Sequence, residues 1–202
     1  YGILGLIDSI EKFDINKKVL SDALKKVDRA ISNRVIVEVL KGVLIVAKGD
    51  TLSLTGSNAD LSVKFDIHKD EDNGLNIEQE GGVVLPAKEL IKIVRSMPES
   101  RVYFSNVDTR QVIITSGKSK FAISGQESTS YPKLPKVDNE INFEIKGEHL
   151  NNLIEKTIHS VSDLETRPIL TGINLTLKNS QLTAISTDAH RLSKVENVDV
   201  QI

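Results

Sequence analysis

The chain carries an internal repeat that is visible from its 202 residues alone. When Phe13 is placed over Phe143, a shift of 130 residues, the register continues without a gap for about fifty positions. The identical pairs include Leu20 with Leu150, Lys26 with Lys156, Ser32 with Ser162, Leu40 with Leu170, Gly42 with Gly172, Lys48 with Lys178, Leu52 with Leu182, Ala59 with Ala189 and Lys64 with Lys194. A shorter copy of the pattern begins near residue 83. Self-similarity of this kind indicates a duplicated unit that occurs three times.

Each unit predicts a short strand, then a helix, then antiparallel strands, which is an α+β arrangement. Helices are expected at residues 17–31, 87–97 and 147–161, where apolar residues recur at three- and four-residue spacing. The apolar stripes are Leu20, Leu24, Val27 and Ile31 in the first helix, Leu90, Val94 and Met97 in the second, and Leu150, Ile154, Thr157 and Val161 in the third. Asn16 is the expected N-cap of the first helix, and Pro98 ends the second.

The units predict two domains. Two of them form a first domain at residues 13–127, and Pro132 and Pro135 mark residues 128–140 as a linker. Residues 141–202 are the first half of a second domain, so we expect the chain to be part of a longer polypeptide. We interpret residues 1–12 as a leader or a vector-derived segment.

Composition and motifs argue against an enzyme. The chain contains no Cys, and no apolar run approaches the roughly 20 residues that cross a membrane. There is no phosphate-binding glycine loop, metalloprotease motif or nucleophile elbow. Asp188, His190 and Arg191 lie together but have no partner carboxylate or third ligand nearby in sequence. We expect this segment to be a turn held by side-chain hydrogen bonds, with no metal and no cofactor.

Two of the predicted helices carry a cationic ridge opposite the apolar stripe. The ridge residues are Lys18, Lys25 and Arg29 in the first helix, with Asp22 among them, and Lys88, Lys92 and Arg95 in the second. Aligned Lys and Arg side chains suit contact with backbone phosphates, which accept cationic donors whatever the base sequence. The third helix differs, because Glu148, Asn152, Glu155 and His159 occupy its outer ridge. The formal net charge of −2 is compatible with one basic face but not with a wholly basic surface.

Five segments in order resemble those of bacterial DNA sliding clamps. They are Val83-Val84-Leu85-Pro86-Ala87, Thr115-Ser116-Gly117-Lys118-Ser119-Lys120-Phe121, Tyr131-Pro132-Lys133-Leu134-Pro135, Glu165-Thr166-Arg167-Pro168-Ile169-Leu170-Thr171-Gly172 and Thr187-Asp188-Ala189-His190-Arg191-Leu192. The resemblance covers about residues 13–202 and implies the DNA-clamp fold, with helices on one face and sheets on the other. Two departures are Ala189, where the family often has Gly, and Val39 before Leu40, where it often has Pro.

The resemblance also implies site residues. Arg34 and the six ridge cations would lie near duplex DNA. Half of a pocket for partner peptides would be formed by Leu170, Thr187, Ala189, His190, Arg191 and Leu192. The edge formed by Lys118, Lys120, Phe121 and Ile123 would meet the neighbouring subunit of a head-to-tail homodimeric ring.

The family's role would make the chain part of a non-catalytic processivity factor in the bacterial cytoplasm. Its partners would be double-stranded DNA, the replicative DNA polymerase, the clamp loader, repair polymerases and other clamp-binding proteins. Without its third domain, this chain is expected to be monomeric. The alternative is a repeat-built module that binds peptides or proteins and has no role on DNA.

Overall fold

The computed structural model describes residues 12–32, 36–58, 60–107, 110–134 and 143–201. The chain divides into two compact units, with the boundary between residues 135 and 136. No helix in the described part of the chain is long and apolar enough to cross a membrane.

The first unit contains two helices and ten strands in the described ranges. The helices are α1 (Lys17–Asp28) and α2 (Ala87–Ser96). The strands are β1 (Lys12–Asn16), β2 (Gly42–Lys48), β3 (Thr51–Ser57), β4 (Ser62–His68), β5 (Asn76–Gln79), β6 (Gly81–Pro86), β7 (Arg101–Asn106), β8 (Gln111–Ser116), β9 (Ser119–Ser124) and β10 (Gln126–Glu127). Two 3-10 helices, η1 (Glu38–Lys41) and η2 (Ser128–Ser130), complete the unit.

The strands form two antiparallel sheets that exchange their first strands. One sheet has the order β5-β1-β7-β8-β9, and the other has the order β10-β6-β2-β3-β4. Strand β1 opens the first repeat but pairs with β7 of the second, whereas β6 opens the second repeat but pairs with β2 of the first. An ion pair between Arg101 of β7 and the buried Asp14 of β1 reinforces the first exchange. Neither repeat therefore completes a sheet by itself.

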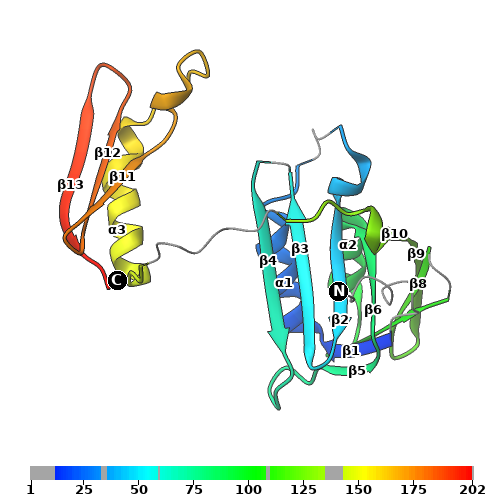
Figure 1. Cartoon of the computed structure of the whole chain (residues 1–202). Coiled ribbons are helices and arrows are strands. Elements are labelled where there is room, and N and C mark those ends of the chain that lie inside the picture. The colour runs from blue at the N-terminus through cyan, green and yellow to red at the C-terminus, as the bar shows by residue number, and fades with distance from the viewer. Residues whose placement is uncertain (1–11, 33–35, 59, 108–109, 135–142, 202) are drawn as a thin grey trace, which may run out of the picture. The chain divides into compact units, whose positions relative to one another are not determined.

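Both helices pack on the same two sheets. Figure 1 shows α1 and α2 behind strands β4, β3, β2 and β6. The apolar stripes of both helices pack in one core that also contains Ile45, Leu54 and Ile114, and only Ile31, beyond the end of α1, is partly exposed. Helix α1 lies so close to β3 that a Cβ added to Gly56 would be 2.5 Å from the carbonyl oxygen of Val27.

The signals that begin α1 and end α2 act as expected, although α1 ends at Asp28, earlier than the expected residue 31. The Oδ1 atom of Asn16 accepts a hydrogen bond from the backbone N–H of Lys18 at 2.9 Å, which satisfies a free donor of the first turn of α1. Helix α2 ends at Ser96, two residues before Pro98. Strands β4 and β5 were not identified in the sequence, although Val63, Phe65 and Ile67 alternate with polar residues along β4.

The start of the predicted linker packs on the first unit. Strand β10 pairs with β6, and η2 follows it. Tyr131 is buried in a small cluster with Val39, Leu40 and Val84. The described chain up to Tyr131 is therefore attached to the first unit by packing, beyond the expected domain end at residue 127.

The second unit has one helix on a three-stranded sheet in its described residues. Its elements are α3 (Gly147–Thr157), the 3-10 helices η3 (Ile158–Ser160) and η4 (Pro168–Leu170), and the strands β11 (Asn174–Lys178), β12 (Gln181–Thr187) and β13 (Leu192–Asp199). The sheet has the order β11-β12-β13. Strand β13 was not identified in the sequence.

The predicted stripe of the third helix was partly wrong. Leu153 is fully buried against Leu182, Ala184 and Val200, whereas Ile154 is 40% exposed. Thr157 is buried as expected, so the single error within α3 is that Leu153 takes the place of Ile154 on the side that faces β12 and β13. The strand expected near residue 143 is only a single bridge between Glu144 and Gln201.

Candidate functional site

Each helix of the first unit presents a row of cations to solvent. At about 100° per residue, Lys18, Lys25 and Arg29 fall within one narrow arc of α1 that is opposite its buried stripe. On α2, a similar narrow arc away from the buried stripe contains Lys88, Lys92 and Arg95. All six residues are exposed. The stripes face one common core, so the two ridges point away from the sheets.

The ridges contain one described acid. Asp22 lies between Lys18 and Lys25 on α1, and its Oδ1 atom is 3.0 Å from the Lys25 Nζ atom. Both partners are about half exposed, so the pair adds little stability, but the Asp22 carboxylate offsets one of the three positive charges on this ridge. No ion pair in the described part of the chain involves the cations of α2. The α2 ridge is thus the less compensated of the two.

A lysine between the ridges fixes the relative position of the helices. Lys17, at the start of α1, donates hydrogen bonds from Nζ to the carbonyl oxygens of Arg95 at 3.0 Å and Met97 at 2.6 Å. These carbonyls lie at the end of α2, where the helix dipole favours a positive charge. The helices are therefore antiparallel neighbours. This role of Lys17 has no local signal in the sequence, because its partners are about 80 positions away in the chain.

A second lysine of α1 serves packing. The Lys26 ammonium lies 4.0 Å from the ring centroid of Phe65 on β4, which is a cation–π contact. Lys26 is therefore directed toward the sheet and does not belong to the ridge. Arg34, the other cation expected near DNA, lies outside the described residues.

The predicted turn at residues 187–191 is present and is held by its own side chains. Asp188 accepts hydrogen bonds at Oδ1 from the backbone N–H groups of His190 and Arg191, at 2.9 and 3.0 Å. Its Oδ2 atom accepts from Nε of Arg191 at 2.8 Å. The backbone donor of His190, followed by that of Arg191, lowers the pKa of Asp188 from 3.8 to about 2. Thr187 adds a hydrogen bond from its hydroxyl to the carbonyl oxygen of Arg191.

Ala189 adopts a backbone conformation that suits glycine. Its φ angle is +75°, in the left-handed region where a Cβ is unfavourable. The conformation is required because three hydrogen bonds to Asp188 close the turn around this residue. This agrees with the expectation that Gly is common at this position in the family.

The turn gathers five of the six expected pocket residues. Ala189, His190, Arg191 and Leu192 are exposed, and Leu192 is 63% exposed. Leu170 belongs to a separate segment, η4, and its carbonyl oxygen accepts from the backbone N–H of Ser162 at 2.9 Å. Among the described residues, no hydrogen bond joins Leu170 to the turn.

Strand β9 forms one edge of its sheet. It pairs with β8 and lies at the end of the strand order. Lys118 lies in the preceding turn and is exposed, as are Lys120 and Phe121 on the strand, while Ile123 is buried in the core of the first unit. Of the four predicted interface residues, the first three have accessible side chains, and Ile123 could contribute through its backbone.

Two family models match the chain. The N-terminal domain of the DNA polymerase III beta subunit matches residues 11–135, and the central domain of the same subunit matches residues 144–201. The chain belongs to the DNA polymerase III beta subunit family.

Relatives and solved structures agree with this assignment. The Beta sliding clamp of Bacillus subtilis is 38% identical over 184 residues, which cover 90% of this chain and 49% of the relative. The crystal structure of the DNA polymerase sliding clamp from the same organism gives a TM-score of 0.91 at 36% identity, over 96% of this chain and 51% of that one. The beta chain from Streptococcus pneumoniae gives 0.88 at 32% identity, over 94% and 52%. The expected DNA-clamp fold is confirmed. This beta-subunit chain spans about half the length of the curated relatives it matches.

The described part of this beta-subunit chain contains no cluster of three or more His, Cys, Asp or Glu residues that could hold a metal ion. The other features described above are the exposed cations of α1 and α2, the turn after β12 and the free edge of β9. All three features suit binding.

Proposed function

We propose that this chain supplies the first domain and part of the second domain of a DNA sliding clamp. The clamp would encircle duplex DNA without catalysing a reaction, and would tether the replicative polymerase and repair proteins in the bacterial cytoplasm. The observation that carries the proposal is the pair of cationic ridges on α1 and α2, which face the same side and oppose their buried stripes. Contacts from Lys and Arg to phosphates hold a duplex without reading its sequence. A protein that moves along DNA requires this property.

The ridges are also rigid enough to act together. Lys17 ties the start of α1 to the end of α2, and both helices share one core. The six cations are thus presented in a fixed pattern. A peptide-binding module without a role on DNA would not need an aligned row of cations on each of two neighbouring helices.

The turn after β12 is proposed as one wall of a site for partner peptides from the polymerase, the clamp loader and repair proteins. Its exposed Leu192 and polar rim match the composition of a small recognition site. Much of the binding energy in such sites comes from a few buried apolar anchors. Since one wall buries an anchor only partly, clamp-binding peptides should bind this chain at least tenfold more weakly than a three-domain clamp. Equal affinities by calorimetry would contradict this placement.

The free edge of β9 is proposed as the contact with the next subunit in a head-to-tail ring. An unpaired strand edge offers backbone donors and acceptors to another chain. The 202 residues match the N-terminal and central domains of the subunit, so light scattering of these residues by themselves should find a monomer in dilute solution.

A chimera tests the clamp proposal directly. This chain replaces the matching 184 residues of the Bacillus subtilis Beta sliding clamp, and the product is loaded onto a nicked circular duplex. A clamp should remain on the circle in high salt and be lost when the circle is cut, because encirclement is topological. A folded, dimeric chimera that leaves circular and linear DNA at the same rate would refute the proposal.

A further inference from the structure

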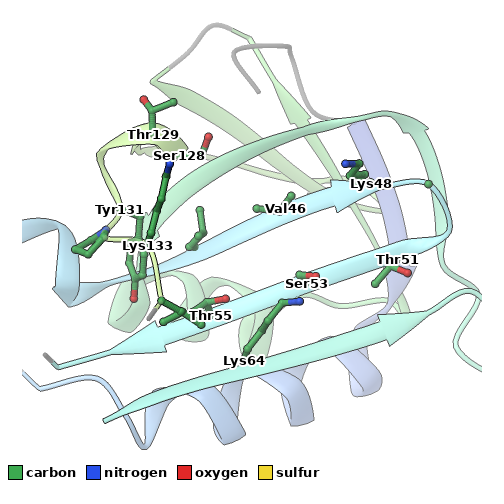
Figure 2. A pocket seen from close by; sticks show the side chains of 14 residues that line it. Val46, Lys48, Thr51, Ser53, Thr55, Lys64, Ser128, Thr129, Tyr131 and Lys133 are labelled. Atoms are coloured by element: carbon green, nitrogen blue, oxygen red, sulfur yellow. The ribbon is translucent and has the colours of Figure 1, made fainter. Parts of the chain in front are cut away.

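The first unit carries an open groove on the sheet face that is turned away from the helices. Its volume is about 960 Å³, near the upper end of the roughly 300–1,000 Å³ typical of ligand sites. Outer-face residues of β2, β3 and β4 form its floor, and residues 128–134 form one wall. Figure 2 shows the labelled side chains of both parts around the groove, with the helices beyond the far face of the sheet.

The floor follows from the alternation of side chains along β2 and β3. Ile45 and Leu54 point into the core with the helices, so their neighbours on the same strands face outward. Leu44 and Val46 give β2 an apolar outer row, and both are partly exposed. Tyr131 packs beside Leu44 and closes one side of this row.

The groove is bordered by cations. Lys48, Lys64 and Lys133 line it, and no lining residue carries a carboxylate. Lys64 is partly compensated by Asp66, whose Oδ2 atom is 3.0 Å from its Nζ atom. All three lysines are exposed, and among the described residues Lys48 and Lys133 take part in no ion pair.

Two described carboxylates beside the groove, those of Asp66 and Glu80, are already engaged. Asp66 also accepts a hydrogen bond from the Ser53 hydroxyl. Burial raises the pKa of Asp66, but the hydrogen bonds from Ser53 and Lys64 and the positive charge of Lys64 together outweigh burial, so the pKa is lowered from its usual value. At the other end of the groove, Glu80 accepts from the backbone N–H of Gly49 at 2.7 Å. Two of the three cations are thus left for an acidic ligand.

We propose that this groove binds an extended acidic peptide segment of a partner protein. An apolar side chain of the peptide sits on Leu44 and Val46, and its carboxylates face Lys48, Lys64 and Lys133. The site differs from the turn after β12, from the cationic ridges and from the β9 edge. It would give the first domain a partner contact of its own on the outside of the sheets.

The probe is the capped tetrapeptide Asp-Leu-Leu-Asp, titrated to millimolar concentration into the ¹⁵N-labelled chain. We expect amide shifts confined to β2, β3, β4 and residues 128–134, and weaker binding as salt is raised. The peptide Asn-Leu-Leu-Asn tests the charge, and Asp-Gly-Gly-Asp tests the apolar anchor. Each should bind at least fivefold more weakly.

Exposed lysines provide variants that should fold normally, which circular dichroism checks. Lys48→Glu combined with Lys133→Glu should weaken binding of Asp-Leu-Leu-Asp at least tenfold. The matched control Lys178→Glu, on the second unit, should change it less than twofold. The proposal is overturned if millimolar peptide causes no amide shifts, or if the shifts map outside the groove. It is also overturned if Asn-Leu-Leu-Asn binds as tightly as Asp-Leu-Leu-Asp. Groove shifts that depend on protein concentration without peptide would overturn it too, and would assign the groove to a second copy of the chain.

Discussion

Removing the charge from the α2 ridge should weaken DNA binding by an amount that depends on salt. The triple variant Lys88→Gln, Lys92→Gln and Arg95→Gln keeps similar side-chain length but removes three of the six ridge cations. These residues are exposed and take no part in the core, so the fold should be unchanged. What changes is the number of counterions released from DNA on binding.

The size of the effect follows from the number of contacts. Each neutralised phosphate contributes about −0.9 to the slope of log K against log salt, so six contacts give about −5 and three give about −3. Between about 50 and about 200 mM salt, the unaltered chain should lose about a thousandfold in affinity and the variant only about fortyfold.

Fluorescence anisotropy of a short labelled duplex measures both slopes. The matched control is Lys12→Gln, Lys69→Gln and Lys118→Gln, which removes three exposed cations of the first unit that lie outside α1 and α2. The control should keep the slope of the unaltered chain. If both triple variants lower the slope equally, binding depends on total charge alone, and the assignment of DNA to α1 and α2 is wrong.

Three further predictions concern stability. Ala189→Gly should raise the free energy of unfolding by about 1 kcal/mol, because the φ angle of +75° is unfavourable for a residue with a Cβ; urea denaturation measures this, and a lower stability would contradict it. Gly56→Ala should lower the free energy of unfolding by about 1–3 kcal/mol, since the added Cβ would meet the carbonyl oxygen of Val27 at 2.5 Å. The control is Gly147→Ala, where a Cβ meets nothing within 4 Å, and it should leave the free energy of unfolding unchanged. The pKa of Asp188 is lowered in the fold, so its stabilisation of the turn is present above pH 3.8 and is lost as the pH falls toward about 2. NMR of the two backbone amides that Asp188 binds should follow this loss, and Asp188→Asn should abolish the pH dependence.

Much of the fold was predictable because its signals are local. The apolar stripes placed α1 and α2 in the correct phase, and Asn16 marked the start of α1. The third stripe was correct at Thr157 and wrong at Ile154, because Leu153 and Ile154 are adjacent apolar residues and the position of β12 and β13 decides which of them is buried.

The exchange of first strands was not predictable, because no local pattern shows that β1 belongs with β7. The Lys17 contacts and the burial of Tyr131 depend on the same long-range arrangement. The motif at residues 187–192 did predict a turn, since Asp188 bonds to residues only two and three positions away. The outer groove was missed because its lysines belong to separate segments and share no spacing.

The exchanged strands also set an order of assembly during synthesis. Ile15 pairs with Val102, which is 87 residues later in the chain. At about 5–20 residues per second, a ribosome needs roughly 4 to 17 seconds to make that stretch. Strands β2, β3, β4 and β6 can join earlier, while β1 has only the four-residue β5 as a neighbour. The β6-β2-β3-β4 part of the sheet that carries the groove can therefore form before β7, β8 and β9 have been made, and β10 joins that sheet at its end.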